Sequence, residues 1–222
     1  MTGYKISEIF TSVNGEGLKS GELTTFIRFV GCNLNCPYCD TRYAIERNAE
    51  YKEMSLLDIY KRIVDSKIKN VTITGGEPLI QKEIEKLLQL LSMDKTLSVE
   101  IETNGSKSIK PFLAMNNRPS FTLDYKTPSS NMERFMDLQN FEFVDKKDCV
   151  KFVCGSLADL EKMEQIVKEY QLDEKTNVFV SPIFDKIKPV EIADYLIKNK
   201  LNNIKLQLQI HKIIWEPDKR GV

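Results

Sequence analysis

The stretch Gly31-Cys32-Asn33-Leu34-Asn35-Cys36-Pro37-Tyr38-Cys39-Asp40 decides the fold of this chain. Its three cysteines follow the spacing C-x3-C-x2-C. A four-iron cluster normally takes four cysteine thiolates, so a compact set of three with no obvious fourth leaves one iron open to another ligand. The stretch therefore predicts a cluster-binding loop, and chemistry is expected at the open iron.

A structural zinc site is the main alternative for this loop. Zinc in such sites usually has four protein ligands, and the only histidine, His211, lies far along the chain. A module that binds zinc or transfers electrons, with no substrate, is therefore kept as a hypothesis from a different class. Metal analysis distinguishes it from an enzyme.

The composition favours a single cytoplasmic domain that acts on a small molecule. The 222 residues contain no linker-like stretch or composition break, so one domain is expected over residues 1–222. Thirty-two basic residues balance thirty-two acidic ones, which argues against binding to nucleic acid or an anionic membrane. Five cysteines, three of them clustered, and no signal peptide indicate a reducing compartment. Cys149 and Cys154 are expected in the core.

Apolar runs alternate with helical periodicity along most of the chain, which predicts β/α units. Strands are expected at residues 24–30, 71–74, 97–102, 121–124, 150–153, 177–181 and 204–210. These are too few for a closed eight-fold barrel, so the predicted fold is α/β, a partial open (β/α) barrel of about six parallel strands. Catalytic groups in such folds lie at the carboxyl ends of the strands, and the cysteine loop directly follows the first expected strand.

Helices are expected between the strands, where apolar residues recur at helical spacing. Ser55 with Asp58, Ser156, and Pro189 are typical residues of helix starts. The apolar stripes comprise Leu56, Ile59, Tyr60, Ile63 and Val64; Ile80, Ile84, Leu87, Leu88 and Leu91; Leu157, Leu160, Met163, Val167 and Tyr170; and Ile192, Tyr195 and Leu196. They are interpreted as core.

Polar motifs follow three of the expected strands. In Thr74-Gly75-Gly76-Glu77-Pro78, two glycines allow the backbone to approach a ligand without a side-chain clash. Glu102-Thr103-Asn104-Gly105 suits ribose or adenine contacts and equally an ordinary turn. In the segment 124–129, strand alternation places Asp124 and Lys126 on the same side of the strand. The two side chains either face the barrel mouth, where Lys126 would contact a ligand, or form an ion pair in solvent.

The last expected strand alternates strictly between apolar and polar residues. Leu206, Leu208 and Ile210 share one face, and Gln207, Gln209 and His211 share the other. Two amides and an imidazole on one line suit a heterocycle with several donors and acceptors, but an exposed edge strand has the same pattern.

The cysteine spacing, with an aromatic residue before the last cysteine, resembles the cluster loop of radical S-adenosylmethionine (SAM) enzymes. Thr74-Gly75-Gly76-Glu77-Pro78 resembles their glycine-glycine-glutamate-proline motif. Over nearly its whole length the chain resembles the 7-carboxy-7-deazaguanine synthase family within that superfamily. This resemblance rests on Gly15-Glu16-Gly17, Arg28, Cys39-Asp40-Thr41, Glu102-Thr103-Asn104-Gly105, residues 209–215 and Arg220-Gly221-Val222.

The resemblance implies an enzyme of queuosine and 7-deazapurine biosynthesis. Its substrate would be 6-carboxy-5,6,7,8-tetrahydropterin, and a radical ring contraction with loss of ammonia would give 7-carboxy-7-deazaguanine. The implied cofactors are a [4Fe-4S] cluster, SAM, which is regenerated, and Mg²⁺. The implied partners are an external one-electron reductant such as flavodoxin or ferredoxin and a second copy of the chain in a homodimer.

The resemblance also implies site residues, with no catalytic group beyond the cluster and the SAM radical. Cys32, Cys36 and Cys39 would hold the cluster, and Thr41 would bind magnesium. The implied SAM-binding residues are Tyr38, Gly75, Gly76, Glu77, Thr103, Lys126, Thr127 and Pro128. The implied substrate-binding residues are Val13, Asn14, Gly15, Glu16, Arg28, Thr74, Gln209, His211 and Val222, the last through a carboxylate that folds back toward the pterin.

One residue departs from the family pattern. Asn14 stands where the family usually has glutamine, which is one methylene longer, so a side-chain contact with the substrate would be weaker but a backbone contact would not. A radical-generating activase has a similar cysteine loop and is a second enzymatic hypothesis. It would act on a partner protein and ignore pterins.

Overall fold

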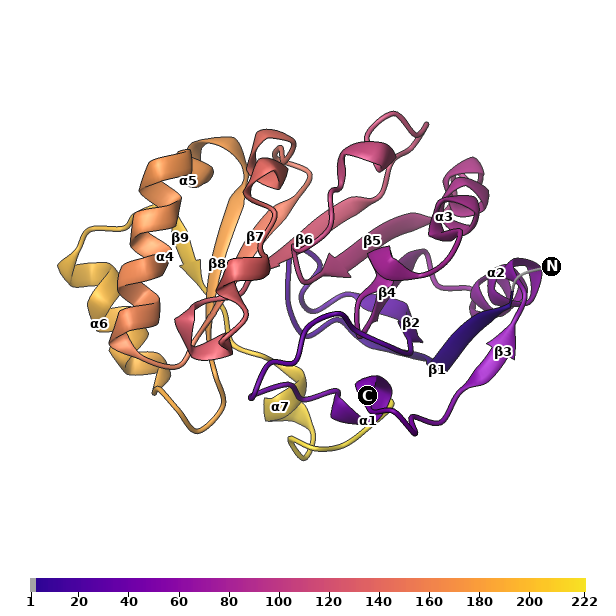
Figure 1. Ribbon diagram of the computed structural model, residues 1–222, viewed down its shortest axis with the longest axis horizontal. Helices are drawn as coiled ribbons and strands as arrows, with labels where there is room; N and C mark the ends of the chain where they lie inside the picture. Colours follow the sequence, from indigo (N-terminus) through magenta and orange to yellow (C-terminus); the bar gives the residue numbers. More distant parts are fainter. Residues whose placement is uncertain (1–2) are drawn as a thin grey trace.

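The structure is a computed structural model that describes residues 3–222. Within these residues, nine strands form one sheet in the order β3-β1-β2-β4-β5-β6-β7-β8-β9 (Figure 1). Strands β1 (Tyr4–Val13) and β3 (Lys52–Met54) are antiparallel to their neighbours at one edge. The parallel strands are β2 (Leu23–Phe29), β4 (Asn70–Gly75), β5 (Ser98–Thr103), β6 (Ser120–Tyr125), β7 (Cys149–Cys154), β8 (Asn177–Pro182) and β9 (Ile204–Leu206).

The α/β class and the open barrel-like sheet are confirmed. Each parallel strand lies beside the next one along the chain, and β3 and β9 are the two ends of the strand order, so the described sheet is not closed. The α-helices are α1 (Arg42–Ile45), α2 (Leu56–Ser66), α3 (Ile84–Met93), α4 (Leu157–Tyr170), α5 (Leu172–Lys175), α6 (Pro189–Lys198) and α7 (His211–Ile214). Short 3₁₀ turns span Pro78–Ile80, Lys110–Phe112, Pro128–Ser130, Glu133–Phe135 and Leu138–Glu142. No helix in the described part is long and apolar enough to span a membrane.

The helix starts predicted from the sequence are confirmed. Ser55 Oγ accepts a hydrogen bond from the Asp58 backbone N–H at 3.2 Å, and Asp58 accepts one in return from Ser55 N–H at 3.2 Å. Such a cap contributes about 1 kcal/mol to helix stability. Ser156 Oγ accepts a hydrogen bond from the Asp159 backbone N–H at the start of α4, and Pro189 is the first residue of α6.

The apolar stripes are narrower than predicted. Ile59 and Ile63 are buried, but Val64, one position further, is 47% exposed because the helix turns it away from the sheet. Leu157 is likewise exposed. Ile80 belongs to the 3₁₀ turn before α3, which begins at Ile84.

The two faces of the parallel sheet differ in polarity, and this difference positions the site. On β6, Phe121, Leu123 and Tyr125 belong to the core cluster that also contains the buried residues of α2, α3, α4 and α6. The alternate residues of the same strand, Thr122 and Asp124, bond polar side chains of the neighbouring strands. The apolar face of the sheet therefore packs against the helices, and the opposite face is polar. Figure 1 shows α2, α3, α4 and α6 on the outer side of the curved sheet.

The antiparallel strands β1 and β3 were not predicted from the sequence. Strand β1 alternates cleanly only at its start, where Tyr4 and Ile6 are buried, because the pairing register with β2 shifts between Ile6 and Glu8. Such a bulge breaks the period of two on which strand prediction depends. Strand β1 ends at Val13, just before the Gly15-Glu16-Gly17 motif.

The last predicted strand, 204–210, is wrong beyond Leu206. The side chain of Gln207 pairs with the backbone of Gly17, accepting from its N–H at 2.8 Å and donating to its carbonyl at 3.0 Å. This contact draws the chain out of the sheet, and His211 begins α7. The predicted common polar face of Gln207, Gln209 and His211 is therefore absent: Gln207 holds a loop, while Gln209 and His211 reach the cavity from outside the strand.

Candidate active site

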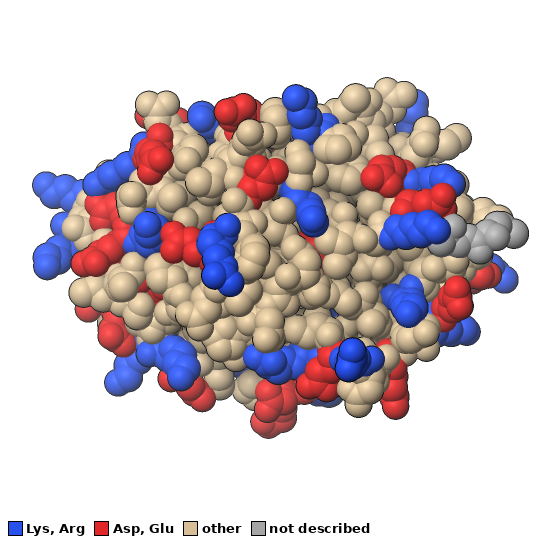
Figure 2. Space-filling view, in the orientation of Figure 1, with Lys and Arg blue, Asp and Glu red and all other residues tan. Residues whose placement is uncertain are grey.

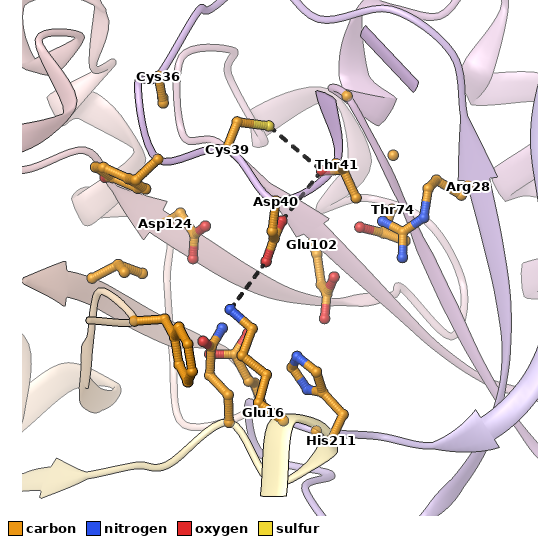
Figure 3. A pocket seen from close by; sticks show the side chains of 18 of the residues that line it. Glu16, Arg28, Cys36, Cys39, Asp40, Thr41, Thr74, Glu102, Asp124 and His211 are labelled. Atoms are coloured by element: carbon orange, nitrogen blue, oxygen red, sulfur yellow. Dashed lines mark hydrogen bonds and ion pairs between the residues drawn. The ribbon is translucent and has the colours of Figure 1, made fainter. Parts of the chain in front are cut away.

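A cavity of about 1050 Å³ lies on the polar inner face at the carboxyl ends of the parallel strands. It brings together most of the residues singled out in the sequence. Lining it are Val13, Asn14, Gly15, Glu16, Arg28, Cys32, Cys36, Tyr38, Cys39, Thr41, Thr74, Gly75, Gly76, Thr103, Lys126, Gln209, His211 and Val222. Glu77, Thr127 and Pro128 are not in its wall. Figure 3 shows Cys36 and Cys39 of the cysteine loop, Arg28, Thr74, Glu102 and Asp124 of the parallel strands, and His211 of α7 around this space.

The cysteine loop joins β2 to α1 and places three thiols on the cavity. Arg42 Nη2 in α1 donates a hydrogen bond to the carbonyl of Cys36 at 3.0 Å, which fixes the middle of the loop. Cys32 Sγ accepts from the backbone N–H of Leu34 at 3.4 Å and from Asn104 Nδ2 at 3.6 Å. N–H donors of this kind favour the thiolate, the form that ligates iron.

The electrostatics of the thiols fit a cationic cluster. Burial raises the pKa of Cys32 and of Cys36, and the pKa of Cys36 is raised further by Cys39 and Cys32, while Lys126 acts to lower it. A positively charged group in the cavity would lower the pKa of Cys32 and Cys36 and so favour their thiolates, the form that ligates iron. Within residues 3–222 no three Cys, His, Asp or Glu side chains are grouped to hold one metal ion. A cluster spreads its ligands over several irons, so its cysteines lie farther apart.

Gly75 and Gly76 pack directly against the cysteine loop. Gly75 has φ of +141°, and a Cβ on Gly76 would lie 2.0 Å from the carbonyl oxygen of Gly31. The backbone N–H groups of Gly76 and Glu77 donate to the carbonyls of Phe29 and Gly31, at 3.2 and 2.9 Å. The absence of side chains at Gly75 and Gly76 thus allows their turn to contact the cysteine loop. It also leaves their backbone accessible to a ligand in the cavity wall.

Glu77 lies beneath the cavity rather than in its wall. Its carboxylate is fully buried and accepts hydrogen bonds from Leu79 N–H, Thr103 Oγ1 and Asn104 N–H, at 2.9, 2.7 and 2.7 Å. The carboxylate ties the end of β4 to the end of β5. It therefore sets where Thr103 and Asn104 lie in the wall, and the Thr103 hydroxyl is already donated to it.

Lys126 projects into the cavity from the end of β6. Its Nζ lies 3.0 Å from Asp124 Oδ2, so the same-side prediction for these two residues is confirmed. The Lys126 side chain is only 13% exposed, which argues against a solvated surface pair. Thr127 is buried and donates to the Val153 carbonyl at 2.9 Å, and Pro128 opens the following 3₁₀ turn.

Arg28 forms the opposite wall together with Thr74, its partner in the β2–β4 register. Its Nε donates to Glu8 Oε1 at 2.8 Å, and Tyr43 Oη donates to the same oxygen at 2.7 Å. The Arg220 guanidinium lies 3.7 Å from the centre of the Tyr43 ring, so the carboxyl-terminal segment, including Val222, adjoins this wall. Figure 3 shows the guanidinium of Arg28 facing the cavity.

The loop after β1 is fixed by its own polar groups. Asn14 Nδ2 donates to buried Glu100 at 3.1 Å, and Asn14 Oδ1 accepts from Glu16 N–H at 3.2 Å. The Asn14 side chain is thus engaged within the protein. Gly15 has no room for a side chain because a Cβ would lie 2.0 Å from His211 Nδ1. Burial lowers the pKa of His211, which favours the neutral imidazole.

Sequence reasoning missed Lys151 in this wall, and it noted Glu102 only as the first residue of the 102–105 motif, without a role of its own. Burial raises the pKa of Glu102 to about 7, against the opposing effect of Lys151. Glu100 and Glu102 alternate with Val99 and Ile101 along β5, as Lys151 alternates with Val150 and Phe152 along β7. Charged residues inside otherwise apolar strands were the available signal.

Thr41 and Asp40 lie next to each other at the edge of the cysteine loop. Thr41 Oγ1 donates to Asp40 Oδ1 at 3.4 Å and lies 3.6 Å from Cys39 Sγ. Lys212 Nζ in α7 lies 3.6 Å from the other oxygen of Asp40 (Figure 3). Figure 2 shows acidic and basic side chains interspersed around the margin of the face in view.

A three-cysteine loop beside a glycine-rich turn in an open β/α barrel defines a radical SAM protein. Residues 26–146 match the Radical SAM superfamily. Over 219 residues the chain is 57% identical to the 7-carboxy-7-deazaguanine synthase of Clostridium acetobutylicum, covering 99% of both chains. It is 38% identical to that of Methanospirillum hungatei, covering 97% of this chain and 87% of the relative.

The chain belongs to the 7-carboxy-7-deazaguanine synthase family. The fold is also that of the crystal structure of QueE from Escherichia coli, with a TM-score of 0.72 and 24% identity over 93% of this chain and 94% of the other. Membership implies a [4Fe-4S] cluster, SAM, a small-molecule substrate and an external reductant. The hypotheses of a zinc module and of a substrate-free electron carrier do not fit this family.

Proposed function

We propose that the protein converts 6-carboxy-5,6,7,8-tetrahydropterin into 7-carboxy-7-deazaguanine and ammonia, as a step of 7-deazapurine biosynthesis. The observation that carries this proposal is the single cavity in which the cysteine loop faces Arg28, Glu16, Glu102 and His211. The cavity combines a cluster-binding side with a side that offers charged and polar partners to a carboxylated heterocycle. The atoms balance, because the product differs from the substrate only by the ammonia released.

The cluster side is assigned to this chain's cysteines and to the residues around them. Cys32, Cys36 and Cys39 would hold the [4Fe-4S] cluster, and SAM bound there would supply a 5′-deoxyadenosyl radical. The backbone of Gly75 and Gly76 and the ammonium of Lys126 face the same space. Tyr38, whose buried hydroxyl has no partner among residues 3–222, would contribute a polar contact there.

The substrate side is assigned to groups of complementary charge. The guanidinium of Arg28 would pair with the substrate carboxylate, for which two parallel hydrogen bonds are the favoured geometry. Glu16 Oε1 is buried and has no hydrogen-bond partner in the described part of the chain, so it is placed to accept from a pterin N–H. Glu102, with its pKa near 7, would hold or release a proton beside the ring.

Magnesium is proposed at Thr41. Mg²⁺ prefers oxygen ligands and retains several waters, so the Thr41 hydroxyl and the adjacent Asp40 carboxylate, together with substrate oxygens and water, fit its needs. We also infer that residues 1–222 act as one domain in the cytoplasm, as a homodimer, with flavodoxin or ferredoxin as the electron donor.

The test is mass spectrometry of a reaction containing the anaerobically reconstituted protein, SAM, Mg²⁺, a reductant and 6-carboxy-5,6,7,8-tetrahydropterin. Formation of 7-carboxy-7-deazaguanine is expected, and omission of Mg²⁺ should reduce its rate. Cleavage of SAM to 5′-deoxyadenosine without any deazaguanine would retain the radical chemistry and refute the substrate assignment.

A further inference from the structure

Lys151 is a buried cation in the cavity wall to which the proposed function gives no role. Its side chain, on β7, is only 7% exposed. Its Nζ lies 3.0 Å from Glu16 Oε2 and 3.2 Å from Asp124 Oδ1. A buried ammonium is costly unless it is paired, and here two carboxylates compensate it. Replacing it would therefore disturb both carboxylates.

The two carboxylates come from distant parts of the chain. Asp124 is the cross-strand neighbour of Lys151 in the β6–β7 register, whereas Glu16 belongs to the loop after β1, 135 residues away in sequence. Asp124 uses its second oxygen to bind Lys126 Nζ at 3.0 Å. Glu16, Lys151, Asp124 and Lys126 thus form a row of alternating charge along the cavity wall. We call these four residues the charge row.

The row leaves one oxygen of Glu16 available. Lys151 binds Oε2, while Oε1 is buried without a hydrogen-bond partner among the described residues. Because one oxygen is fixed by an ion pair, the direction of the other is fixed too. A ligand N–H that reaches Oε1 therefore meets an acceptor whose orientation is already set, which reduces the entropy lost on binding.

The opposite end of the row faces the cluster side. Lys126 is anchored by Asp124, and the position of Asp124 depends on Lys151. Although burial acts to raise it, the pKa of Asp124 is lowered overall by Lys126 and Lys151, so this carboxylate stays ionised between them. One residue thus fixes a group on each side of the cavity.

We propose that Lys151 is a positioning residue that orients Glu16 toward the pterin and, through Asp124, Lys126 toward SAM. The proposal rests on the proposed function for the identity of the pterin, but the part concerning SAM rests only on superfamily membership. Lys151 acts through the two carboxylates and touches no reacting atom.

The experiment compares Lys151→Met with the wild type and with Lys198→Met, which removes an exposed lysine on α6. KM for the pterin and for SAM, kcat, and iron content are measured on the reconstituted enzymes. Loss of a hydrogen bond to a charged group weakens binding roughly tenfold or more. Lys151→Met should therefore raise the KM for the pterin about tenfold or more, and it should also raise the KM for SAM. A general loss of folded protein would lower kcat and iron content and leave both KM values unchanged.

A double-mutant cycle with Glu16→Gln tests whether Lys151 acts through Glu16. If it does, adding Lys151→Met to Glu16→Gln raises the pterin KM far less than it does in the wild type. Additive effects, or KM values within about twofold of the wild type, would overturn the proposal. If Lys151→Met does not fold, Lys151→Arg takes its place, because arginine keeps a cation for both carboxylates but displaces them. An unchanged KM for the pterin in Lys151→Arg would also overturn the proposal.

The two proposals fail in different ways. Absence of deazaguanine from the wild type refutes the proposed function. Product from the wild type, together with unchanged KM values in the Lys151 variants, refutes only the role of Lys151.

Discussion

Arg28 is held by Glu8 through Nε, which donates to Glu8 Oε1 at 2.8 Å. Tyr43 donates to the same oxygen, so the guanidinium is fixed from behind while its terminal nitrogens face the cavity (Figure 3). A guanidinium oriented in this way can bind a carboxylate with two parallel hydrogen bonds. A lysine in its place would retain the charge and lose the paired geometry.

Arg28→Lys is therefore expected to lower kcat/KM for the pterin by roughly ten- to a hundredfold, the equivalent of one or two charged hydrogen bonds. The measurement is initial rate against pterin concentration. Arg47→Lys, at an exposed position after α1, is the matched control and should leave kcat/KM unchanged. Equal values for the two variants would contradict the role of Arg28.

Replacement of Cys36 should abolish the cluster, whereas replacement of a core cysteine should not. Cys36 lies on the cavity, and Cys149 is fully buried on β7 beside Thr122. All protein ligands of the cluster come from the three-cysteine loop, so Cys36→Ala should lose most of its iron and its visible absorption after anaerobic reconstitution. Cys149→Ala should retain both. Wild-type iron content in Cys36→Ala would refute the ligand set.

Glu102 should make stability depend on pH. Burial raises its pKa from 4.5 to about 7; Lys151 opposes this rise, Glu100 and Glu16 add to it, and the Thr74 hydroxyl opposes it. Arg28 also faces it from β2. Between these two pH values the folded state binds more protons than the unfolded state, so the free energy of unfolding falls as the pH rises through this window.

Glu102→Gln removes this dependence because an amide does not ionise. Relative to the wild type, the variant should gain stability between about pH 5 and about pH 8, by on the order of 3 kcal/mol. Anaerobic urea denaturation at the two pH values measures the gain, with the exposed Glu85→Gln as control. A stability difference that is the same at both pH values would show that Glu102 ionises as in the unfolded chain.

The sequence was sufficient for the parallel strands because their apolar runs are bounded by turns, and for the cysteine loop because its spacing is specific. It was insufficient where a tertiary contact overrides the local pattern. The bulge in β1 hides its period, and the contact of Gln207 with Gly17 ends β9 early. The pairing of β1 with β2 and the contact of Gln207 with Gly17 both join residues that are distant in sequence.

The site shows the same division. Residues in recognisable motifs, such as Gly76 and Lys126, were predicted to be near the ligands, and the structure places them on the cavity. Lys151 belongs to no motif, and only the side-by-side arrangement of β5, β6 and β7 shows that it shares one wall with Glu102. Conversely, Glu77 belongs to a motif but serves to join two strand ends.

The contact between Gly76 and Gly31 gives the last prediction. A Cβ at position 76 would lie 2.0 Å from the Gly31 carbonyl oxygen and 2.9 Å from Cys32 Cβ, so Gly76→Ala must push the two loops apart. Gly21 is the matched control: its φ is +90°, but a Cβ there meets nothing within 4 Å. Gly21→Ala should therefore cost only the backbone strain, about 1–2 kcal/mol. Gly76→Ala should cost more than this in urea denaturation and should also lower iron content, because Cys32 moves with Gly31. If both variants lose the same stability and keep wild-type iron, the close packing of the two loops does not position the cluster ligands.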